Sequence, residues 1–243
     1  MLPLRDINPI RTTPFVNYLL ILGNVAAFVK LASLPPWYEP GYALVPARIV
    51  ADPFGEAFTI LTSMFMHANL AHLVGNLWFL WIFGDNVEDA LGHGRYLSFY
   101  LLGGVVAAFA QVATSGASPI PMVGASGAIA AVTGAYLILY PRAPILIMNP
   151  VPLLWLFMGI TLVVPAWIVV GEFFVMNVLM GVQTLGERAL SGDDVAKGGV
   201  AVFAHIGGFV AGVLAVKPMR RGRDATAHRA WDGWRPSPRS RVR

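Results

Sequence analysis

Two residues that lie far apart in the chain, Ser126 and His205, are the first candidates for chemistry. Ser126 lies in the tract Met122-Val-Gly-Ala-Ser126-Gly-Ala-Ile-Ala, where an apolar segment begins, and His205 lies in Ala204-His205-Ile-Gly-Gly208, in another apolar segment. A reactive or ionisable side chain inside a membrane segment indicates a functional site. A hydroxyl together with an imidazole favours nucleophilic hydrolysis, with the imidazole as base.

The composition is that of a membrane protein. Of the 243 residues, 56% are hydrophobic and 12% are charged, whereas soluble domains carry roughly 25% charged residues. The chain contains no cysteine, which excludes disulfides, zinc–thiolate sites, iron–sulfur clusters and cysteine nucleophiles. We expect neither a metal nor a cofactor.

Apolar stretches of the length of a membrane span recur along the chain. A helix needs about 20 mostly apolar residues to cross a bilayer. Five stretches meet this length, at residues 14–33, 64–84, 95–116, 122–140 and 199–216. A sixth apolar tract, from Ala143 to Val182, is long enough for two spans but contains prolines, which break helices.

The basic residues decide between one and two spans in that tract. Nine of the 17 Lys and Arg lie after residue 216, and loops rich in Lys and Arg stay on the inner side of a membrane. A single span at about 164–183 puts this tail on the same side as Arg5 and Arg11, whereas two spans would put it outside. We therefore predict an all-α polytopic bundle of six transmembrane helices, in which 143–163 is a re-entrant or interfacial excursion on the inner side.

The predicted organisation is one membrane domain with an inner-side segment at each end. Residues 1–13 form the N-terminal segment, 14–217 the six-helix domain, and 218–243 a basic tail that is expected to be disordered. Both termini are then cytoplasmic, in a multi-pass protein of the inner cell membrane. Basic tails beside membrane helices more often set orientation or contact anionic lipid than bind nucleic acid, so the expected partner is the bilayer.

Helix lengths place the two reactive residues at a similar depth. The predicted fourth helix runs from Ser126 to Tyr140, or about 22 Å, against about 30 Å of hydrocarbon. Ser126 therefore lies below the outer surface, and His205 lies about 9 Å into the sixth helix from the same side. Non-helical backbone at such a depth must be buried in protein or line a wet cavity. A sunken, water-accessible site follows.

Small residues would let the fourth and sixth helices approach closely. The glycines in question are Gly124, Gly127 and Gly134 on the fourth helix, and Gly207, Gly208 and Gly212 on the sixth. Close backbone approach in membranes depends on such residues. We therefore predict a hydrogen bond between the side chains of Ser126 and His205.

The second predicted helix adds polar residues at the same level. His72 and Asn76 are four residues apart and share one helical face. They could donate hydrogen bonds to an oxyanion, together with the Ser126 backbone N–H at a helix N-terminus. No Asp or Glu is well placed to orient His205, so a Ser–His dyad is predicted in preference to a triad.

At these residues the chain resembles the rhomboid family of intramembrane serine proteases, over about residues 60–216. The matching motifs are Gly124-Ala-Ser126-Gly127, Ala204-His205-Ile-Gly-Gly208 with Gly212, His67-x4-His72-x3-Asn76, and Glu88-x3-Gly92 followed by Phe99 and Tyr100. The resemblance implies that Ser126 is the nucleophile and His205 the general base. It also implies that His72 and Asn76 belong to the oxyanion hole, and we place Gly124 with Ser126 in the same oxyanion and substrate-binding group.

Two positions depart from the family pattern. Some members carry an aromatic residue one turn after the serine, stacked on the catalytic histidine, and this position is Ala130 here. Another residue must then hold the imidazole, or the ring is less restrained. Glu172, inside the predicted fifth span, lies outside the pattern, and we favour a structural role for it. Glu88 and Asp89 are expected to cap a helix or form salt bridges at the inner surface.

The predicted function is that of an intramembrane serine endopeptidase, which cleaves transmembrane segments of single-span or other membrane proteins near the outer face. The family suggests lateral entry of the substrate past Phe173, Phe174 and Met176. Two alternatives remain open at this stage. One is a catalytically inactive rhomboid-like protein that binds membrane clients, and the other is a small transporter.

Overall fold

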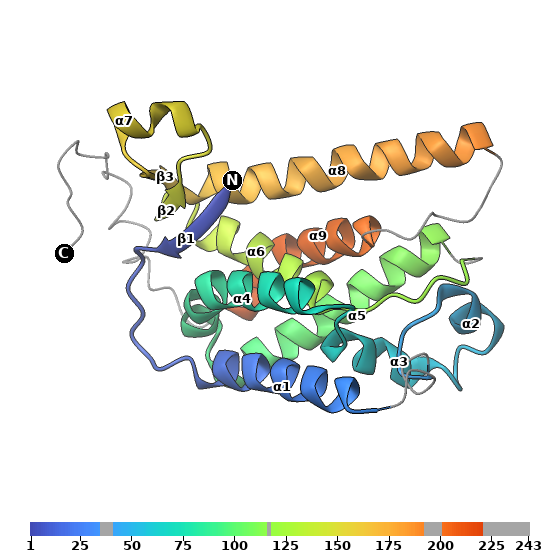
Figure 1. The fold of residues 1–243 in the computed structure, drawn as a ribbon. Helices are drawn as coiled ribbons and strands as arrows, with labels where there is room; N and C mark the ends of the chain where they lie inside the picture. The colour runs from blue at the N-terminus through green and yellow to red at the C-terminus, as the bar shows by residue number, and fades with distance from the viewer. Residues whose placement is uncertain (35–40, 116–117, 192–200, 221–243) are drawn as a thin grey trace.

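Helices make up most of the chain and lie side by side in a bundle (Figure 1). The computed structural model describes residues 1–34, 41–115, 118–191 and 201–220. The main helices are α1 (Phe15–Ala32), α4 (Leu70–Leu91), α5 (His93–Ser115), α6 (Ser126–Leu139), α8 (Ala166–Ser191) and α9 (Val202–Met219). The short helices are α2 (Pro46–Ala51), α3 (Ala57–Thr62), η2 (Ser63–Phe65), η3 (Pro152–Leu154) and α7 (Trp155–Met158). Most of the predicted basic tail, from residue 221 onward, lies outside the described residues.

The helices have the lengths and compositions expected in a membrane. Within the described residues, α1, α5, α8 and α9 are each long and apolar enough to cross a bilayer. The segment Ala57–Phe65 and α4 pass the same test as a pair that is bent by 87°. Helix α6 is apolar but has 14 residues, or about 21 Å against about 30 Å of hydrocarbon. A mostly helical polytopic membrane domain is thus confirmed, while the number of six spans stays a prediction.

The turn between α4 and α5 is tighter than the sequence analysis predicted. In place of a loop over residues 85–95, α4 continues to Leu91 and α5 begins at His93. Gly92 lies between them with a φ of 77°, a conformation that favours glycine. Helix α8 is also longer than predicted, because it extends to Ser191 where a loop was expected from residue 184.

The acidic residues at the end of α4 fix the start of α1. The buried Glu88 carboxylate accepts hydrogen bonds from the backbone N–H groups of Val16 and Asn17, at 3.1 and 2.7 Å. The Asp89 carboxylate accepts from the Thr12 backbone N–H and hydroxyl, at 2.9 and 2.7 Å. Carboxylates stabilise helix starts because the first N–H groups have no partner within the helix. Glu88 therefore has the capping role that was expected, and Asp89 holds the segment just before α1.

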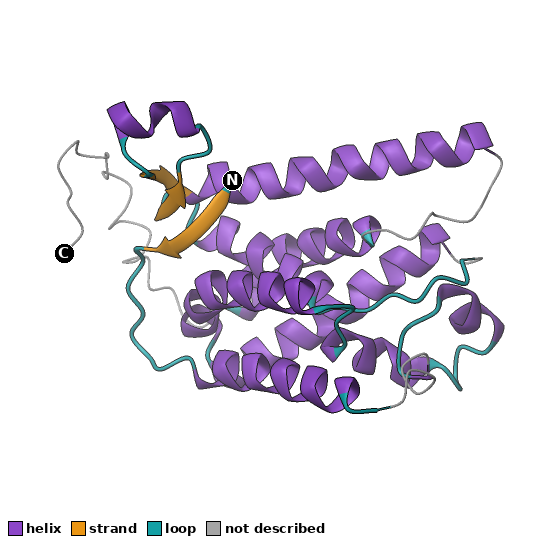
Figure 2. Ribbon diagram, in the orientation of Figure 1, coloured by secondary structure: helices purple, strands orange, loops and turns teal. Residues whose placement is uncertain are grey.

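A small antiparallel sheet, which the all-α prediction omits, lies at the end of the bundle that holds the N-terminus (Figure 2). Its strands, in the order β1-β2-β3, are β1 (Leu2–Asp6), β2 (Pro144–Met148) and β3 (Thr161–Pro165). Leu2 pairs with Met148, and Met148 pairs in turn with Thr161. The predicted N-terminal segment and the predicted excursion at 143–163 are therefore parts of one unit.

Prolines explain why residues 143–163 form a hairpin and not a re-entrant helix. Proline breaks a helix but is tolerated at the ends of strands, and Pro144 begins β2 while Pro165 ends β3. Strand pairing satisfies the backbone polar groups that a helix would otherwise satisfy. The tip of the hairpin is apolar and open, since Leu156 and Phe157 are 91% and 83% exposed. An interfacial position for this tip stays a prediction.

Helix α6 is the central helix, and it packs most extensively against α9. A Cβ atom on Gly212 would lie 2.0 Å from the Ala131 carbonyl oxygen, and one on Gly208 would lie 2.1 Å from the Gly127 carbonyl oxygen. Any side chain there would force the helices apart, so the close approach predicted for these two helices is confirmed.

Three of the six predicted glycines make other contacts. A Cβ on Gly127 would lie 2.5 Å from the Ala107 side chain on α5, compared with 3.8 Å from that of Ala204 on α9. A Cβ on Gly207 would lie 2.3 Å from the Ala110 side chain, so this glycine faces α5. Gly124 precedes α6, has a φ of 128°, and faces His72 on α4. The roles of Gly207 and Gly124 differ from the prediction because the register of α9 turns Gly207 away from α6, and because α6 begins only at Ser126.

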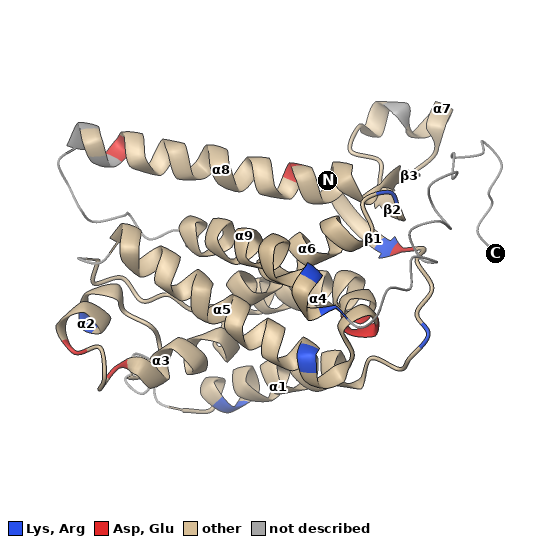
Figure 3. Ribbon diagram, turned by 180° about the vertical axis from the view of Figure 1, so that it is seen from behind, with Lys and Arg blue, Asp and Glu red and all other residues tan. Residues whose placement is uncertain are grey.

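Charged residues lie mostly toward the two ends of the bundle, as expected for a protein that spans a bilayer (Figure 3). At the end with the sheet, the Arg95 guanidinium donates to the backbone carbonyls of Met219 and Arg220, at 3.2 and 3.3 Å. The start of α5 and the end of α9 therefore meet at one end. Glu172 on α8 forms an ion pair with the amino group of Met1, at 2.5 Å, which gives this carboxylate a structural partner.

Candidate active site

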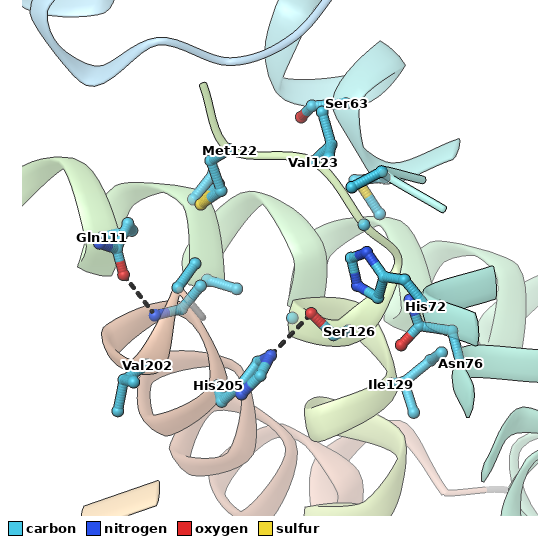
Figure 4. A pocket seen from close by; sticks show the side chains of 18 of the residues that line it. Ser63, His72, Asn76, Gln111, Met122, Val123, Ser126, Ile129, Val202 and His205 are labelled. Carbon is cyan, nitrogen blue, oxygen red and sulfur yellow. Dashed lines mark hydrogen bonds between the residues drawn. The ribbon is translucent and has the colours of Figure 1, made fainter. Parts of the chain in front are cut away.

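Ser126 and His205 point toward one another from two different helices (Figure 4). Ser126 is the first residue of α6, and His205 is the fourth residue of α9. The Ser126 Oγ and the His205 Nε2 form a hydrogen bond of 2.7 Å. His205 is buried and Ser126 is half-buried. The predicted hydrogen bond between these side chains is thus present.

Backbone hydrogen bonds hold the loop that leads to Ser126. The Gly124 N–H donates to the Ser63 carbonyl at 2.9 Å, and Met122 exchanges two backbone hydrogen bonds with Leu44, at 2.7 and 3.2 Å. The loop is therefore fixed to the segment of the chain between α1 and α4. This pairing satisfies backbone polar groups of a segment that belongs to no helix.

The His205 ring has a second partner that the sequence analysis did not predict. Its Nδ1 lies 2.7 Å from the Asn177 Oδ1 on α8. The Phe173 ring, one turn earlier on α8, has its centroid 6.1 Å from the imidazole centroid. Ala130 is fully buried and has no ring to stack on the imidazole, and the side chains of Asn177 and Phe173 contact it from α8. A lone amide in the apolar run of α8, one turn after Phe173, is the signal that could have identified it.

His72 and Asn76 lie on the other side of Ser126, on α4 (Figure 4). A Cβ on Gly124 would lie 2.8 Å from the His72 ring and 3.6 Å from the Asn76 Nδ2, so these groups border the loop before Ser126. Asn76 is 8% exposed, and within the described residues its buried Nδ2 has no hydrogen-bond partner. An unpaired buried amide donor is costly, which makes it a candidate for binding a ligand oxygen.

Other polar residues near the site support the elements around it. The buried His67 ring packs edge to face against His72, with centroids 5.2 Å apart. The Gln111 Oε1 on α5 accepts from the Ala204 backbone N–H at 3.2 Å. Gln111, which the sequence analysis also missed, thus holds the first turn of α9, directly before His205.

A cavity of about 1490 Å³ gives access to these residues. Residues of α4, α5, α6, α8 and α9 line it, together with the loop at 118–124. The lining includes His72, Asn76, Ser126 and His205. A cavity at the two reactive residues is therefore present, while its depth in the membrane stays a prediction. Within the described residues, no group of three or more His, Asp or Glu is arranged to hold a metal ion.

The arrangement has the parts that acyl transfer requires. A hydroxyl is hydrogen-bonded to an imidazole, a further group contacts the other ring nitrogen, and the unpaired Asn76 Nδ2 lies on the other side of the hydroxyl. A model of the rhomboid domain matches residues 55–222, which is more than half of the chain.

The chain belongs to the rhomboid family.

Known rhomboid proteins share parts of this sequence. The chain is 41% identical to Rhomboid protease GluP of Bacillus subtilis over 83 residues, which cover 34% of this chain and 16% of GluP. It is 28% identical to RHOMBOID-like protein 12, mitochondrial, of Arabidopsis thaliana over 224 residues, which cover 84% of this chain and 58% of that protein. It is 33% identical to human Presenilin-associated rhomboid-like protein, mitochondrial, over 122 residues, which cover 47% and 31%. The chain thus spans less than two thirds of the length of each relative.

Proposed function

We propose that this rhomboid protein is an intramembrane serine endopeptidase that cleaves transmembrane segments of membrane proteins. The observation on which the proposal chiefly depends is the 2.7 Å hydrogen bond between the Ser126 Oγ and the His205 Nε2, within a cavity set below one end of the bundle. A hydroxyl becomes nucleophilic when an adjacent base can take its proton.

The first half of the reaction forms an acyl-enzyme. The Ser126 Oγ attacks the scissile carbonyl carbon while its proton moves to the His205 Nε2. The tetrahedral intermediate then collapses, the C–N bond breaks, and the imidazolium returns the proton to the leaving amine. The substrate helix must unwind locally to present its carbonyl, so small or helix-breaking residues are expected near the cut.

The negative charge of the intermediate needs donors on the side of Ser126 away from His205. Asn76 offers its unpaired Nδ2, and His72 lies beside it on α4. The N-terminus of α6 adds the Ser126 backbone N–H, since the first N–H groups of a helix have no partner within it. Gly124 lets the substrate-facing loop pass close to His72.

The second half of the reaction releases the acyl group. A water molecule enters the cavity and loses a proton to His205 as it attacks the ester carbonyl. The ester C–O bond then breaks, and His205 returns the proton to the Ser126 Oγ. No step requires a metal or a cofactor.

We infer that the cut lies near the outer face of the inner cell membrane, with both termini in the cytoplasm. The sheet end of the bundle holds the basic ends of α5 and α9, and the cavity opens away from it, among the loop at 118–124 and the first turns of α4, α6 and α9. Positive-inside bias then assigns the sheet end to the cytoplasm. Substrates and the surrounding lipid are the partners that this proposal requires.

The test is cleavage of a single-span substrate in liposomes that contain the purified protein. Wild-type protein is expected to give a cut product, and Ser126→Ala and His205→Ala are each expected to lower the rate by about 10⁴-fold or more. Ser98→Ala, which removes a hydroxyl on α5 that bonds to the Gly94 carbonyl, is the matched control and is expected to keep the wild-type rate.

The same assay separates the two alternatives. An inactive client-binding protein would retain the substrate in pull-downs without cutting it, and a transporter would move solute without either effect. Cleavage that is undiminished in Ser126→Ala or His205→Ala would refute the proposed dyad.

A further inference from the structure

Asn177 is a buried amide that meets the catalytic imidazole from a third helix. Its side chain is on α8, whereas Ser126 and His205 are on α6 and α9. The Asn177 residue is 7% exposed, and its two polar atoms both have partners. The Oδ1 lies 2.7 Å from the His205 Nδ1, and the Nδ2 donates to the Phe173 carbonyl at 2.8 Å.

These two contacts fix which ring nitrogen of His205 carries the proton. A backbone carbonyl can only accept, so the amide NH₂ of Asn177 must point to Phe173 and the amide oxygen must point to the imidazole. An amide oxygen can likewise only accept, so the His205 Nδ1 must donate to it. In the neutral ring the Nε2 then has a free lone pair, and this is the atom that faces the Ser126 hydroxyl.

We propose that Asn177 is the positioning residue of the site, which completes a Ser126–His205–Asn177 triad. This inference rests on the proposed function, because it assigns Asn177 a role in that reaction. Asn177 holds His205 in the tautomer that can take the Ser126 proton, and it orients the ring toward Ser126. Since its amide is neutral, it restrains the imidazolium formed in the reaction without the charge that an aspartate would provide.

The position of α8 therefore determines whether His205 can accept the proton of Ser126. The Nδ1 contact depends on α8 lying against α9, as it does in this structure. If α8 moves away, the imidazole loses its acceptor, and both the rotation of the ring and its tautomer become free. When α8 has moved away and the site is open, His205 is therefore no longer held in the form that activates Ser126.

The experiment compares Asn177→Leu with Asn24→Leu in detergent and in liposomes. Asn24 is a matched control because it is also a buried amide in an apolar helix, and its Nδ2 donates to the Leu20 carbonyl, four residues earlier, at 2.7 Å. It lies on α1, away from the cavity lining. The rate of Ser126 labelling by a fluorophosphonate and the rate of substrate cleavage are both measured against pH.

We expect Asn177→Leu to slow both rates by about 10- to 100-fold, the range of one hydrogen bond to a group that becomes charged. Asn24→Leu is expected to lose thermal stability but to keep both rates. Asn177→Asp retains the acceptor and adds negative charge, so it is expected to stay within a few-fold of wild type while the acid limb of its pH–rate profile moves to higher pH. Rates in Asn177→Leu within twofold of wild type, or an equal loss in Asn24→Leu, would overturn the proposal.

A tautomer measurement separates this inference from the proposed function. In ¹⁵N-labelled protein, long-range nitrogen–proton correlations report whether the His205 Nδ1 or Nε2 is protonated, independently of any cleavage. The proposal requires the Nδ1–H form in wild-type protein and its loss in Asn177→Leu. An Nε2–H form in wild type would overturn it, even if the protein cleaves. If wild type shows the Nδ1–H form but neither cleaves nor labels, the protease proposal fails and the positioning of His205 by Asn177 stands.

Discussion

Two groups of buried polar residues differ in how far their hydrogen bonds are satisfied. At the sheet end of the bundle, Glu88 has three partners, namely two backbone N–H groups of α1 and the His93 ring, and the Asn86 side chain donates to Asp6 at 2.8 Å. In the cavity, by contrast, the Asn76 Nδ2 has no partner within the described residues, and the Ser126 hydroxyl faces open space beside it.

The difference matters because a paired and an unpaired buried polar group affect stability in opposite directions. A buried polar group that is fully paired contributes to stability, and its loss destabilises the fold. A buried donor without a partner lowers stability, and it persists where a ligand or a transition state will supply the acceptor. The sheet end therefore holds α1, α4 and β1 together, and the unpaired Asn76 Nδ2 supports the proposed catalytic role of the cavity.

Removal of the unpaired donor gives the largest expected effect on activity. Asn76→Ala is predicted to lower kcat by about 10²- to 10³-fold, because an oxyanion donor acts mainly in the transition state. Its melting temperature is predicted to stay close to that of wild type, since no protein hydrogen bond is broken. The checks are steady-state cleavage in liposomes and thermal unfolding in detergent.

Asn86→Ala is the opposing control, because it removes a buried amide that is paired. It is predicted to lower the melting temperature and to keep the cleavage rate per folded molecule. If Asn76→Ala destabilised the protein and Asn86→Ala slowed the chemistry, the distinction between the two regions would be wrong.

Removal of a paired carboxylate gives the largest expected effect on stability. Glu88→Ala leaves two buried N–H groups of α1 without an acceptor, so the free energy of unfolding is predicted to fall by about 3 kcal/mol. Glu88→Gln, which keeps one acceptor oxygen, is predicted to lose less. Denaturant titration in mixed micelles measures both. A stability equal to wild type in Glu88→Ala would show that this carboxylate does not hold α1.

Alanine substitutions at two glycines, one between α6 and α9 and one on α8, are predicted to change the stability of the protein in opposite directions. Gly212→Ala places a methyl group against the Ala131 carbonyl, and strain of this kind costs about 1–3 kcal/mol. Gly171→Ala on α8 meets nothing within 4 Å, so it is predicted to be neutral or to stabilise the helix by about 0.5–1 kcal/mol. Thermal unfolding of the pair tests this, and equal shifts in the same direction would contradict the packing described here.

The smallest predicted effect is a pH dependence at the sheet end. Burial, with a further contribution from the Asp85 carboxylate, raises the pKa of Asp6 from 3.8 to about 7. Between these values the folded protein keeps a proton that the unfolded chain releases, so this contribution to stability is lost as pH rises toward and through 7. Asp6→Asn is predicted to show a smaller fall in melting temperature between pH 5 and pH 8 than wild type. Parallel pH profiles of the two proteins would exclude this role for Asp6.

The sequence predicts the helical part of this fold well because apolar length and glycine spacing are local properties. The short α6 and its contact with α9 follow from Ser126, Gly208 and Gly212 alone. The sheet could not be predicted in the same way, since β1 pairs with a strand about 140 residues away and strand pairing depends on tertiary contacts. The prolines at 144 and 165 indicated a broken helix, but not its replacement by a hairpin.

The site shows the same division between local and tertiary information. Ser126, His205, His72 and Asn76 lie in recognisable motifs at predictable depths, so sequence alone brings them together. Asn177 and Gln111 belong to no motif and reach the site from α8 and α5 only because of the way the helices pack. Contacts of this kind depend on helix rotation, which apolar helices with weak amphipathic patterns leave undetermined.

The most direct test of the central claim is to find which residue of the membrane-embedded protein reacts with a serine-directed fluorophosphonate. Peptide mapping by mass spectrometry after labelling in liposomes locates the adduct without the need for a known substrate. The account predicts one modified residue, Ser126, and loss of the adduct in His205→Ala. Modification of a different serine, or labelling of Ser126 at the wild-type rate in His205→Ala, would contradict it.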